Sequence, residues 1–323
     1  MSSNLPVVSL EYALSDWILN EYPFSIINGE EIAKEIFRLY KGKSYQKTRI
    51  ARIRSSEPSI RVYNNLISNL TVAGIISEIP DFNTVASATY PFSGSYIIRS
   101  KPEYSPYEAA CVIFPYSHLS YLTAMDWHRF TEKNPRIIQL GTPSRNIWKA
   151  KGLADLENFE LEDVSSFKKE SFLPKYPVKN TLFGMMVDPI TDNDSSSINT
   201  IRGSSVRITS PARTLVDMTR KPVLCGGSQH AIDSFLEHAQ PYRKQIMTYL
   251  EKNGSKIDRA RVGFLMDKVM GIKDPIIDAW KEESSKTRGS SKILVPGADF
   301  SEYYDPDWCL SLNLESLQDY GVH

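Results

Sequence analysis

The sequence is poor in cysteine and histidine and has no long hydrophobic run. Its three cysteines, Cys111, Cys225 and Cys309, are far apart and form no CxxC pair. This pattern argues against a disulfide framework or a structural zinc site and favours a reducing compartment. The longest apolar runs, AACVIF (109–114) and LFGMMV (182–187), are far shorter than the roughly 20 residues that span a bilayer. The first residues have no basic segment of a secretory signal, so we expect a cytoplasmic protein without a membrane partner.

The chain also has no net charge to attract nucleic acid as a whole. Lysine plus arginine and aspartate plus glutamate each number 38 among 323 residues. With 41% hydrophobic and 24% charged residues, the composition is that of a folded globular protein. The length predicts two domains, which we expect at residues 1–100 and 101–323.

Catalytic signatures are missing as well. The sequence contains no GxGxxG, GxxxxGK[ST], HExxH or GxSxG motif, and its histidines have no metal-ligand spacing. CGG (225–227) is better interpreted as a tight turn before a helix at 228–239 than as a nucleophile loop. We therefore expect no enzyme activity, no cofactor and no metal. The alternative is a metal-dependent nuclease that uses the acidic cluster VDPITDND, with Asp188, Asp192 and Asp194 as ligands.

The first hundred residues predict three helices followed by a two-stranded hairpin. The first two helices are expected near 9–20 and 28–43, the second with Glu30 and Glu31 in its first turn. In SSEPSIRVYNNLISNLTVAGIISEIP (55–80), Ser55 or Ser56 can cap the third helix, and Gly74 suits its left-handed end. IISEI (75–79) and SYIIRS (95–100) then predict two strands. This order is typical of a winged helix-turn-helix, whose third helix enters the major groove of DNA.

Charge and helical spacing point to a DNA-binding surface in the same part. Residues 34–61 contain nine basic and two acidic residues, a net charge of +7 in a chain that is neutral overall. Such a patch is suited to phosphate binding. At 100° per residue, one face of the third helix is polar, and arginine and asparagine can pair with guanine and adenine edges. We predict phosphate contacts from Lys47, Arg49, Arg52 and Arg54, and base contacts from Arg61, Asn64, Asn65 and Ser68. Tyr63 points toward the apolar side and is expected to pack.

The remainder predicts a mixed α/β domain. In VRITSPARTLVDM (206–218), a strand leads into a helix that Ser210 caps and Pro211 begins, and Arg213 can pair with Asp217 four residues later. Without a base beside it, Ser210 is not expected to be a nucleophile. A second helix lies in NGSKIDRARVGFLMDKVMGIKDP (253–275), and SKILVPG (291–297) and WCLSLNL (308–314) predict strands. A second basic surface could form from Arg243, Lys244, Lys256, Arg259, Arg261 and Lys268.

Four segments together resemble AbiE-type antitoxins, the regulatory half of type IV toxin–antitoxin systems in abortive phage infection. They are PYSHLSYLTAMDWHRFTEKNP (115–135), ITSPARTLVDM with the following CGG, RARVGFLMDKVMG, and SKILVPG with DPDWCLSLNL. They follow one another in consistent order over about residues 60–315. The chain departs from the family in its long basic segment before the third helix and in Arg129, where the family commonly has glycine.

The resemblance implies an α+β protein with an N-terminal winged helix-turn-helix and a C-terminal antitoxin domain. It implies a transcriptional autorepressor that binds repeats in its own promoter, with inverted repeats expected, as double-stranded DNA. The functional partner would be a nucleotidyltransferase-like toxin that is opposed without a stable complex. In the antitoxin domain, Arg213, Asp217 and Arg261 have structural or interaction roles. The alternative is a stand-alone winged-helix regulator without a toxin.

Overall fold

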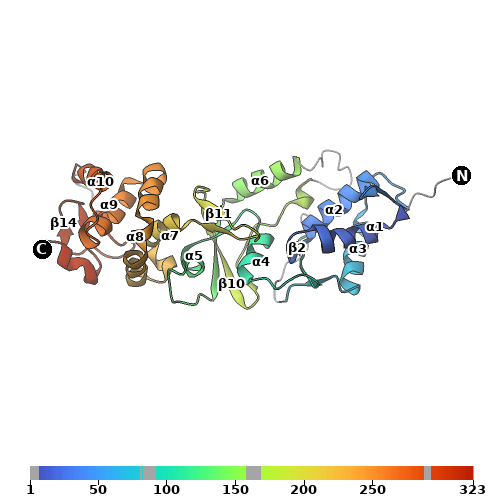
Figure 1. The fold of residues 1–323 in the computed structure, drawn as a ribbon, viewed down its shortest axis with the longest axis horizontal. Helices are drawn as coiled ribbons and strands as arrows, with labels where there is room; N and C mark the ends of the chain where they lie inside the picture. The colour runs from blue at the N-terminus through green and yellow to red at the C-terminus, as the bar shows by residue number, and fades with distance from the viewer. Residues whose placement is uncertain (1–6, 81, 83–91, 158–168, 287–291, 323) are drawn as a thin grey trace. The chain divides into compact units, whose positions relative to one another are not determined.

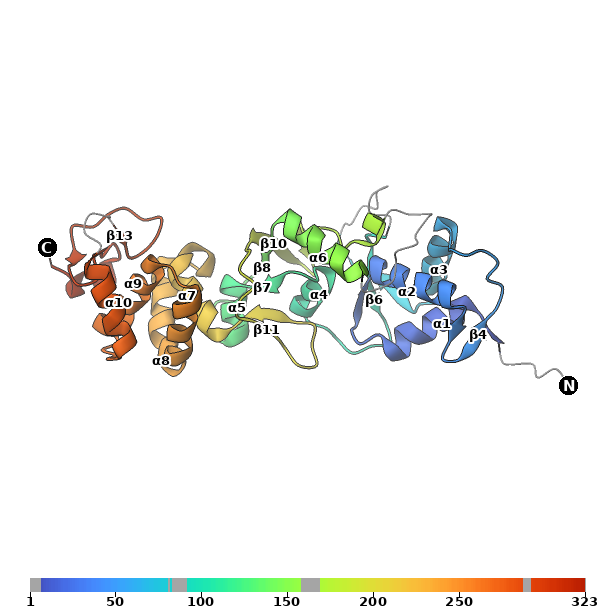
Figure 2. The same ribbon diagram turned by 90° about the horizontal axis from the view of Figure 1, so that it is seen from above.

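The computed structural model describes residues 7–80, 82, 92–157, 169–286 and 292–322, and its fold is mixed α+β (Figures 1 and 2). Two compact units emerge. Unit 1 comprises residues 1–118, 136–193 and 200–207, and unit 2 comprises residues 119–135, 194–199 and 208–323. Each unit is described by itself.

The N-terminal part of unit 1 has three helices on a small antiparallel sheet. The helices are α1 (Leu10–Asp16), which continues as one π-helical turn at Trp17–Glu21, α2 (Gly29–Gly42) and α3 (Ile60–Val72). The strands are β2 (Ile26–Asn28), β5 (Ile76–Glu78) and β6 (Ser95–Ile98), in the order β2-β6-β5. All pairings are antiparallel, with Ile26 opposite Ile97 and Ile76 opposite Ile98. The predicted helices and both predicted strands are therefore confirmed. Most of the turn-rich stretch between β5 and β6 lies outside the described residues.

The start of α3 was predicted a few residues too early. Its N-cap is Ser59, and no side-chain hydrogen bond caps it. The hydroxyl of Ser55 instead lies 2.6 Å from that of Tyr40 and donates to the carbonyl oxygen of Glu57. Gly74 takes the expected left-handed conformation, with φ of +71°.

A β-hairpin between α2 and α3 was not predicted. It consists of β3 (Ser44–Tyr45) and β4 (Thr48–Ile50), and β4 also pairs in parallel with β1 (Val7–Val8). Gln46 and Lys47 connect β3 to β4 with φ of 45° and 67°. Two consecutive positive φ values are typical of the type I′ turn, which glycine and asparagine favour. The basic segment before α3 thus has a defined conformation.

The rest of unit 1 contains α4 (Pro106–Ile113), β8 (Ile137–Thr142), α6 (Arg145–Glu157), a 3-10 helix (Lys169–Phe172), β9 (Asn180–Leu182) and β10 (Met185–Thr191). Strand β10 lies between β8, which is parallel to it, and β9, which is antiparallel. The core extends from the N-terminal helices to Leu156 and Phe172. The ring of Tyr63 is fully buried there against Phe92 and Phe172, as its predicted packing role requires.

The side chain of Glu30 is buried in the folded protein. It lies in the first turn of α2, and the residue is only 5% exposed. Burial raises the pKa of its carboxyl group to about 8, although the backbone at the helix start acts in the opposite direction. The ionised form therefore costs free energy in the folded state.

We expect Glu30→Gln to stabilise the protein increasingly between pH 5 and pH 8. A raised pKa means that the folded state holds a proton that the unfolded state loses above its ordinary pKa near 4.5. Wild-type stability should therefore fall as the pH rises from there through about 8, and the amide variant should lack this loss, on the order of 2 kcal/mol. Urea unfolding at pH 5 and pH 8 measures the difference. The exposed Glu103→Gln is the control, and equal pH slopes for wild type and Glu30→Gln would contradict the assignment.

Unit 2 is mainly helical. Its helices are α5 (Tyr121–His128), α7 (Pro211–Arg220), a 3-10 turn (Pro222–Cys225), α8 (Ser228–Asn253), α9 (Lys256–Phe264) with a π-helical turn (Leu265–Val269), α10 (Pro275–Ser285) and a 3-10 helix (Glu315–Tyr320). Its strands β13 (Lys292–Ile293), β14 (Tyr304–Asp305) and β15 (Leu310–Ser311) form a sheet in the order β13-β15-β14. Three further strands, β11 (Ile198–Thr200), β12 (Arg207–Thr209) and β7 (His118–Leu119), follow one another in that order, and each has residues in both units.

The predicted tight turn at 225–227 is confirmed, with positive φ at Gly226 and Gly227. Ser255 and Asp258 form a capping box at the start of α9. Arg129 ends α5 with φ of 60°, a conformation that glycine adopts without strain. The helix expected at 228–239 is wrong in length, because α8 continues through Pro241 to Asn253.

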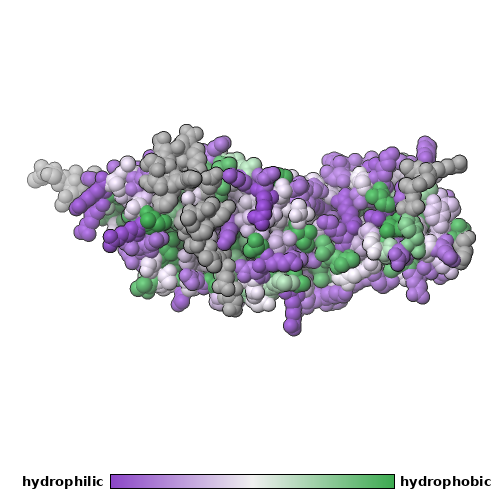
Figure 3. Space-filling view, turned by 180° about the vertical axis from the view of Figure 1, so that it is seen from behind, coloured by the Kyte–Doolittle hydropathy of each residue, from purple (hydrophilic) through white to green (hydrophobic). Residues whose placement is uncertain are grey.

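No described helix is both long enough and apolar enough to cross a bilayer. Hydrophilic residues cover most of the molecular face in Figure 3, and hydrophobic residues appear between them in small groups.

Candidate nucleic-acid interface

The polar face of α3 is exposed as its spacing predicts. Arg61, Asn64, Asn65 and Ser68 are all exposed, whereas Leu66 and Leu70 are buried. The apolar face ends before Ala73, the C-cap of the helix, which is exposed. The side chain of Asn69 donates to the carboxylate of Glu11 at 3.1 Å, which ties α3 to α1. The helix is therefore fixed on one side and open on the other.

The four predicted phosphate-binding residues lie on the hairpin and in the segment after it. Lys47 is in the turn, Arg49 is in β4, and Arg52 and Arg54 follow, all with exposed side chains. Across the residues that the structure describes, none of these four forms an ion pair with a carboxylate. Their charge is therefore available to an external anion.

Two other basic residues do not contribute to this patch. Lys34 lies 2.6 Å from the carboxylate of Glu31, and Nε of Arg38 donates to Glu35 at 2.7 Å. Both belong to the run of nine from which the charge of +7 was counted. The sequence count therefore overstates the free charge, because (i, i+3) pairs on one helix neutralise part of it.

Acidic residues anchor the hairpin at its base. The hydroxyl of Tyr45 in β3 lies 2.5 Å from Asp16 and 2.9 Å from Glu21, and the side-chain amide of Gln46 also donates to Glu21. Burial and these two carboxylates raise the pKa of Tyr45, so its hydroxyl stays protonated and can donate. The hairpin is thus attached to α1 and its π-helical turn through Tyr45 and Gln46, whereas its cations Lys47 and Arg49 lie in the turn and in β4.

This arrangement combines two kinds of group that nucleic acids require. Exposed guanidinium and ammonium groups bind phosphates without regard to sequence, whereas arginine and amide side chains on a helix can pair with base edges. All eight predicted residues belong to unit 1 and lie on the hairpin, the following segment or the open face of α3.

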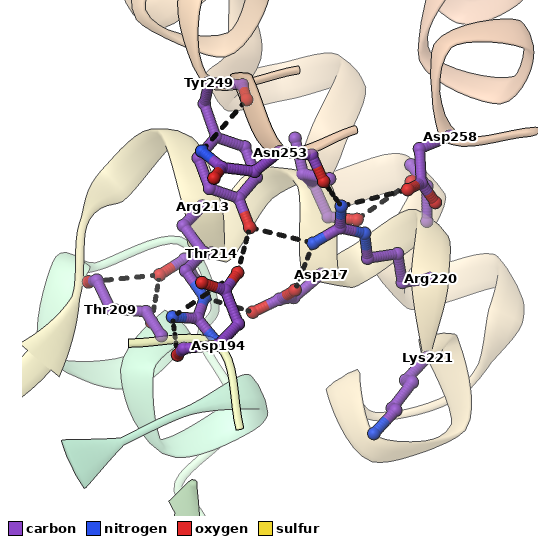
Figure 4. Close-up of polar contacts among 12 residues, drawn as sticks. Asp194, Thr209, Arg213, Thr214, Asp217, Arg220, Lys221, Tyr249, Asn253 and Asp258 are labelled. Carbon is purple, nitrogen blue, oxygen red and sulfur yellow. Dashed lines mark hydrogen bonds and ion pairs between the residues drawn. The ribbon is translucent and has the colours of Figure 1, made fainter. Parts of the chain in front are cut away.

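A second polar site surrounds Arg213 in unit 2 (Figure 4). Its side chain is 3% exposed, and one terminal nitrogen donates to the carbonyl oxygens of Asp194 at 2.8 Å and Ser196 at 2.7 Å. The carboxylate of Asp217 lies 3.7 Å from Nε, so the predicted ion pair along α7 is present. Arg213 therefore fixes the 194–196 segment to the start of α7.

Arg220 and Tyr249 extend this network to two further helices. Arg220 donates to the hydroxyl of Tyr249 in α8 at 2.8 Å and to Asp258 in α9 at 2.9 Å (Figure 4). The hydroxyl of Tyr249 in turn donates to Asp194 at 3.0 Å. Burial raises the pKa of Asp194, but hydrogen bonds from Ser196 and the charge of Arg213 outweigh it and hold the pKa below its usual value. The same balance, with Arg220 as the main partner, lowers the pKa of Asp258. The carboxylates therefore stay ionised and join three helices.

Ser210 caps α7, as predicted, and accepts a hydrogen bond from the backbone nitrogen of Arg213 at 3.3 Å. The fold also brings His128 to this corner, which its distance in sequence concealed. Nε2 of His128 lies 2.8 Å from the carbonyl oxygen of Thr209, and because a carbonyl only accepts, Nε2 carries the proton. This nitrogen cannot act as a base for Ser210. Burial also raises the pKa of the Cys225 thiol, which disfavours the nucleophilic thiolate.

The other residues that the sequence indicated as interaction or metal-binding residues each have partners of their own. Arg261 is buried, and its Nε donates to the carbonyl oxygen of Ile293 at 3.0 Å, which joins α9 to β13. Asp188 pairs with Lys179 and Asp192 with His118, both at 3.2 Å, while Asp194 serves the Arg213 network. Over the described ranges, no three histidine, cysteine or acidic side chains lie together as metal ligands.

The expected second basic surface is largely neutralised. Lys256 and Arg259 pair with Glu283, and Lys268 pairs with Asp305 and Asp307. The sequence offered no signal for these pairs, or for Asp194, Tyr249 and Asp258 around Arg213, because the partners are brought together only by the fold.

No family model matches the chain, and no curated protein matches it. Among solved structures, that of the RV2827C protein from Mycobacterium tuberculosis is similar over 98% of this chain and 95% of that chain. The sequence identity is 12% and the TM-score is 0.46, a similarity too distant to transfer a function.

Proposed function

We propose that the protein is a DNA-binding transcriptional autorepressor with an N-terminal winged helix-turn-helix, and the antitoxin of a type IV toxin–antitoxin system. It binds double-stranded promoter DNA, with inverted repeats as the preferred operator. It acts without catalysis and counteracts a nucleotidyltransferase-like toxin with which it forms no stable complex.

One observation carries the DNA-binding part of this proposal. The exposed face of α3 presents Arg61, Asn64 and Asn65, and the hairpin segment that precedes it in the chain carries arginines without a carboxylate partner among the described residues. The order of helices and strands in this part, with the sheet order β2-β6-β5, supports a winged helix-turn-helix. In that arrangement α3 occupies the major groove, and the hairpin between α2 and α3 reaches the phosphates beside it.

The antitoxin part depends on the resemblance of four sequence segments to AbiE-type antitoxins. In the structure, residues of these segments maintain the fold of unit 2: Arg213 and Asp217 in the buried network, Arg261 on the carbonyl of Ile293, and Arg129 at the left-handed end of α5. A stand-alone regulator would have the same DNA-binding surface, so an adjacent gene for a nucleotidyltransferase distinguishes the two functions.

Substitutions can distinguish the phosphate contacts from the base contacts of the proposed DNA-binding surface. Arg52→Ala with Arg54→Ala should weaken binding to operator and unrelated DNA alike, and should lower the slope of log K against log salt by about 1.8, because two phosphate contacts are lost. Asn64→Ala should instead reduce the preference for the operator by about tenfold, since one base pairing is lost. Fluorescence anisotropy with both DNAs at several salt concentrations measures these effects.

The control is Lys149→Ala with Lys151→Ala, which removes two exposed charges from α6 in unit 1. If the arginine variant bound DNA with the wild-type salt slope, or Asn64→Ala kept full preference, the surface would be misplaced. Co-expression of the full-length protein with the neighbouring toxin tests the antitoxin part separately, and growth without rescue would contradict it.

A further inference from the structure

Unit 2 contains a groove that the proposed function does not use. It has a volume of about 610 Å³ and lies between the start of α7, the segment around Asn199 and one face of α8. Tyr249 forms part of its wall, and its hydroxyl is held by Arg220 and Asp194. This wall is fixed by the same network that fixes α7, so the groove has a rigid side.

The charge of the groove is positive. Lys244 and Lys252 line it, and none of the described residues that line it is an aspartate or glutamate, since Asp194 lies behind the hydroxyl of Tyr249 and pairs with Arg213. Both side chains are exposed, and over the described part of the chain neither pairs with an acidic group. Their neighbours Lys256 and Arg259 both pair with Glu283. Two ammonium groups directed at a concave surface without acidic groups favour an anionic ligand.

The kind and spacing of the polar groups in the groove indicate which class of anion fits it. Lys244, Thr248 and Lys252 follow one another at intervals of four residues along α8, so their Cα atoms are about 6 Å apart along the helix axis. The groove also contains the side-chain amides of Asn199 and Gln245, for which the described residues provide no hydrogen-bond partner. Ammonium groups suit phosphates, and amides suit the donor and acceptor edges of a base.

We propose that this groove binds a phosphorylated mononucleotide. Lys244 and Lys252 hold its phosphates, and Asn199 and Gln245 contact its base. The volume lies within the range of about 300–1,000 Å³ that is usual for sites of small ligands, which favours one nucleotide over a nucleic-acid strand. This inference goes beyond the proposed function, because all of these residues belong to unit 2 and none belongs to the DNA-binding surface.

Isothermal titration calorimetry of the full-length protein with ATP, GTP, CTP and UTP tests the proposal. We expect one nucleotide per chain, and Lys244→Ala with Lys252→Ala should weaken binding about tenfold or more, because charge-assisted hydrogen bonds are lost. The control is Lys256→Ala with Lys286→Ala, which removes two charges that are paired with Glu283 and Glu282. This control should bind nucleotide as the wild type does. All substituted side chains are exposed, and alanine favours helix, so melting temperatures should be unchanged.

Three outcomes would overturn the proposal. They are no binding of any nucleoside triphosphate, equal binding by the groove variant and the control variant, and equal affinity for inorganic triphosphate, which would leave the base without a role. In the first of these cases, binding of a ten-nucleotide RNA would show that the groove holds a nucleic-acid strand in place of a mononucleotide. Operator binding by the groove variant, measured in parallel, should match that of the wild type, so failure here is distinguishable from failure of the DNA-binding proposal.

Discussion

Replacing Arg213 by alanine is expected to destabilise unit 2 by about 3 kcal/mol, because it removes one of the two arginines that face the buried Asp217 and the donor to two carbonyl oxygens. The guanidinium is almost completely enclosed, and it also satisfies the carbonyl oxygens of Asp194 and Ser196. Both carbonyl oxygens lose this donor at once, and Asp217 keeps Arg220 at 3.6 Å. Removing one member of a buried ion pair costs more than removing both, since the remaining charge stays desolvated.

Urea unfolding followed by circular dichroism measures this loss. Ser210→Ala is the matched control from the same turn, and loss of its cap should cost only about 1 kcal/mol. Arg213→Lys keeps the charge but cannot reach two carbonyls and a carboxylate with a planar fork, so it should fall between the two. A loss below that of Ser210→Ala would show that the network does not support the unit.

The local contacts of the Arg213 network could be predicted from the sequence. The cap at Ser210, the start at Pro211 and the pairing of Arg213 with Asp217 follow from local spacing, and all three are present. The other partners are tens of residues away along the chain. Their side chains meet only after α7, α8 and α9 pack, and neither periodicity nor composition encodes that packing.

The secondary structure could likewise be predicted only where local sequence patterns determine it. The helices and strands around α3 follow from apolar spacing and from Gly74. The hairpin β3–β4 was missed because its turn is Gln46-Lys47, in place of the Asn-Gly that usually marks a type I′ turn. Helix α8 was cut short because Pro241 normally ends a helix, whereas here the helix continues through it to Asn253.

Both the local spacing of the sequence and the long-range contacts of the fold are needed to identify the free charges of the DNA-binding surface. Helical spacing was enough to place Asn64 and Asn65 on the open face of α3. It could not show that Arg38 is neutralised by Glu35 or that Tyr45 anchors the hairpin through Asp16. Charge counting along a sequence therefore finds the region of a basic surface, and only the fold shows which of its charges are free.

Replacing Gly263 in α9 is expected to cause the second large loss of stability. A Cβ atom added there would lie 2.2 Å from the ring of Trp308, which is fully buried and donates to Asp267 at 3.3 Å. Alanine at position 263 should therefore cost about 3 kcal/mol, even though alanine in a helix gains about 1 kcal/mol over glycine. Urea unfolding measures the cost, and Gly42→Ala is the control, because an added Cβ at the end of α2 meets no atom within 4 Å.

A double-mutant cycle separates this clash from a general sensitivity of α9. On a Trp308→Leu background the ring is gone, so adding Gly263→Ala should cost less than 1 kcal/mol, since the smaller side chain leaves space for the methyl group. The Trp308→Leu variant itself should be destabilised by about 3 kcal/mol, because it opens a cavity and removes the donor to Asp267. If Gly263→Ala cost the same with and without the tryptophan, the close approach of α9 to Trp308 would not be the reason that glycine stands at this position.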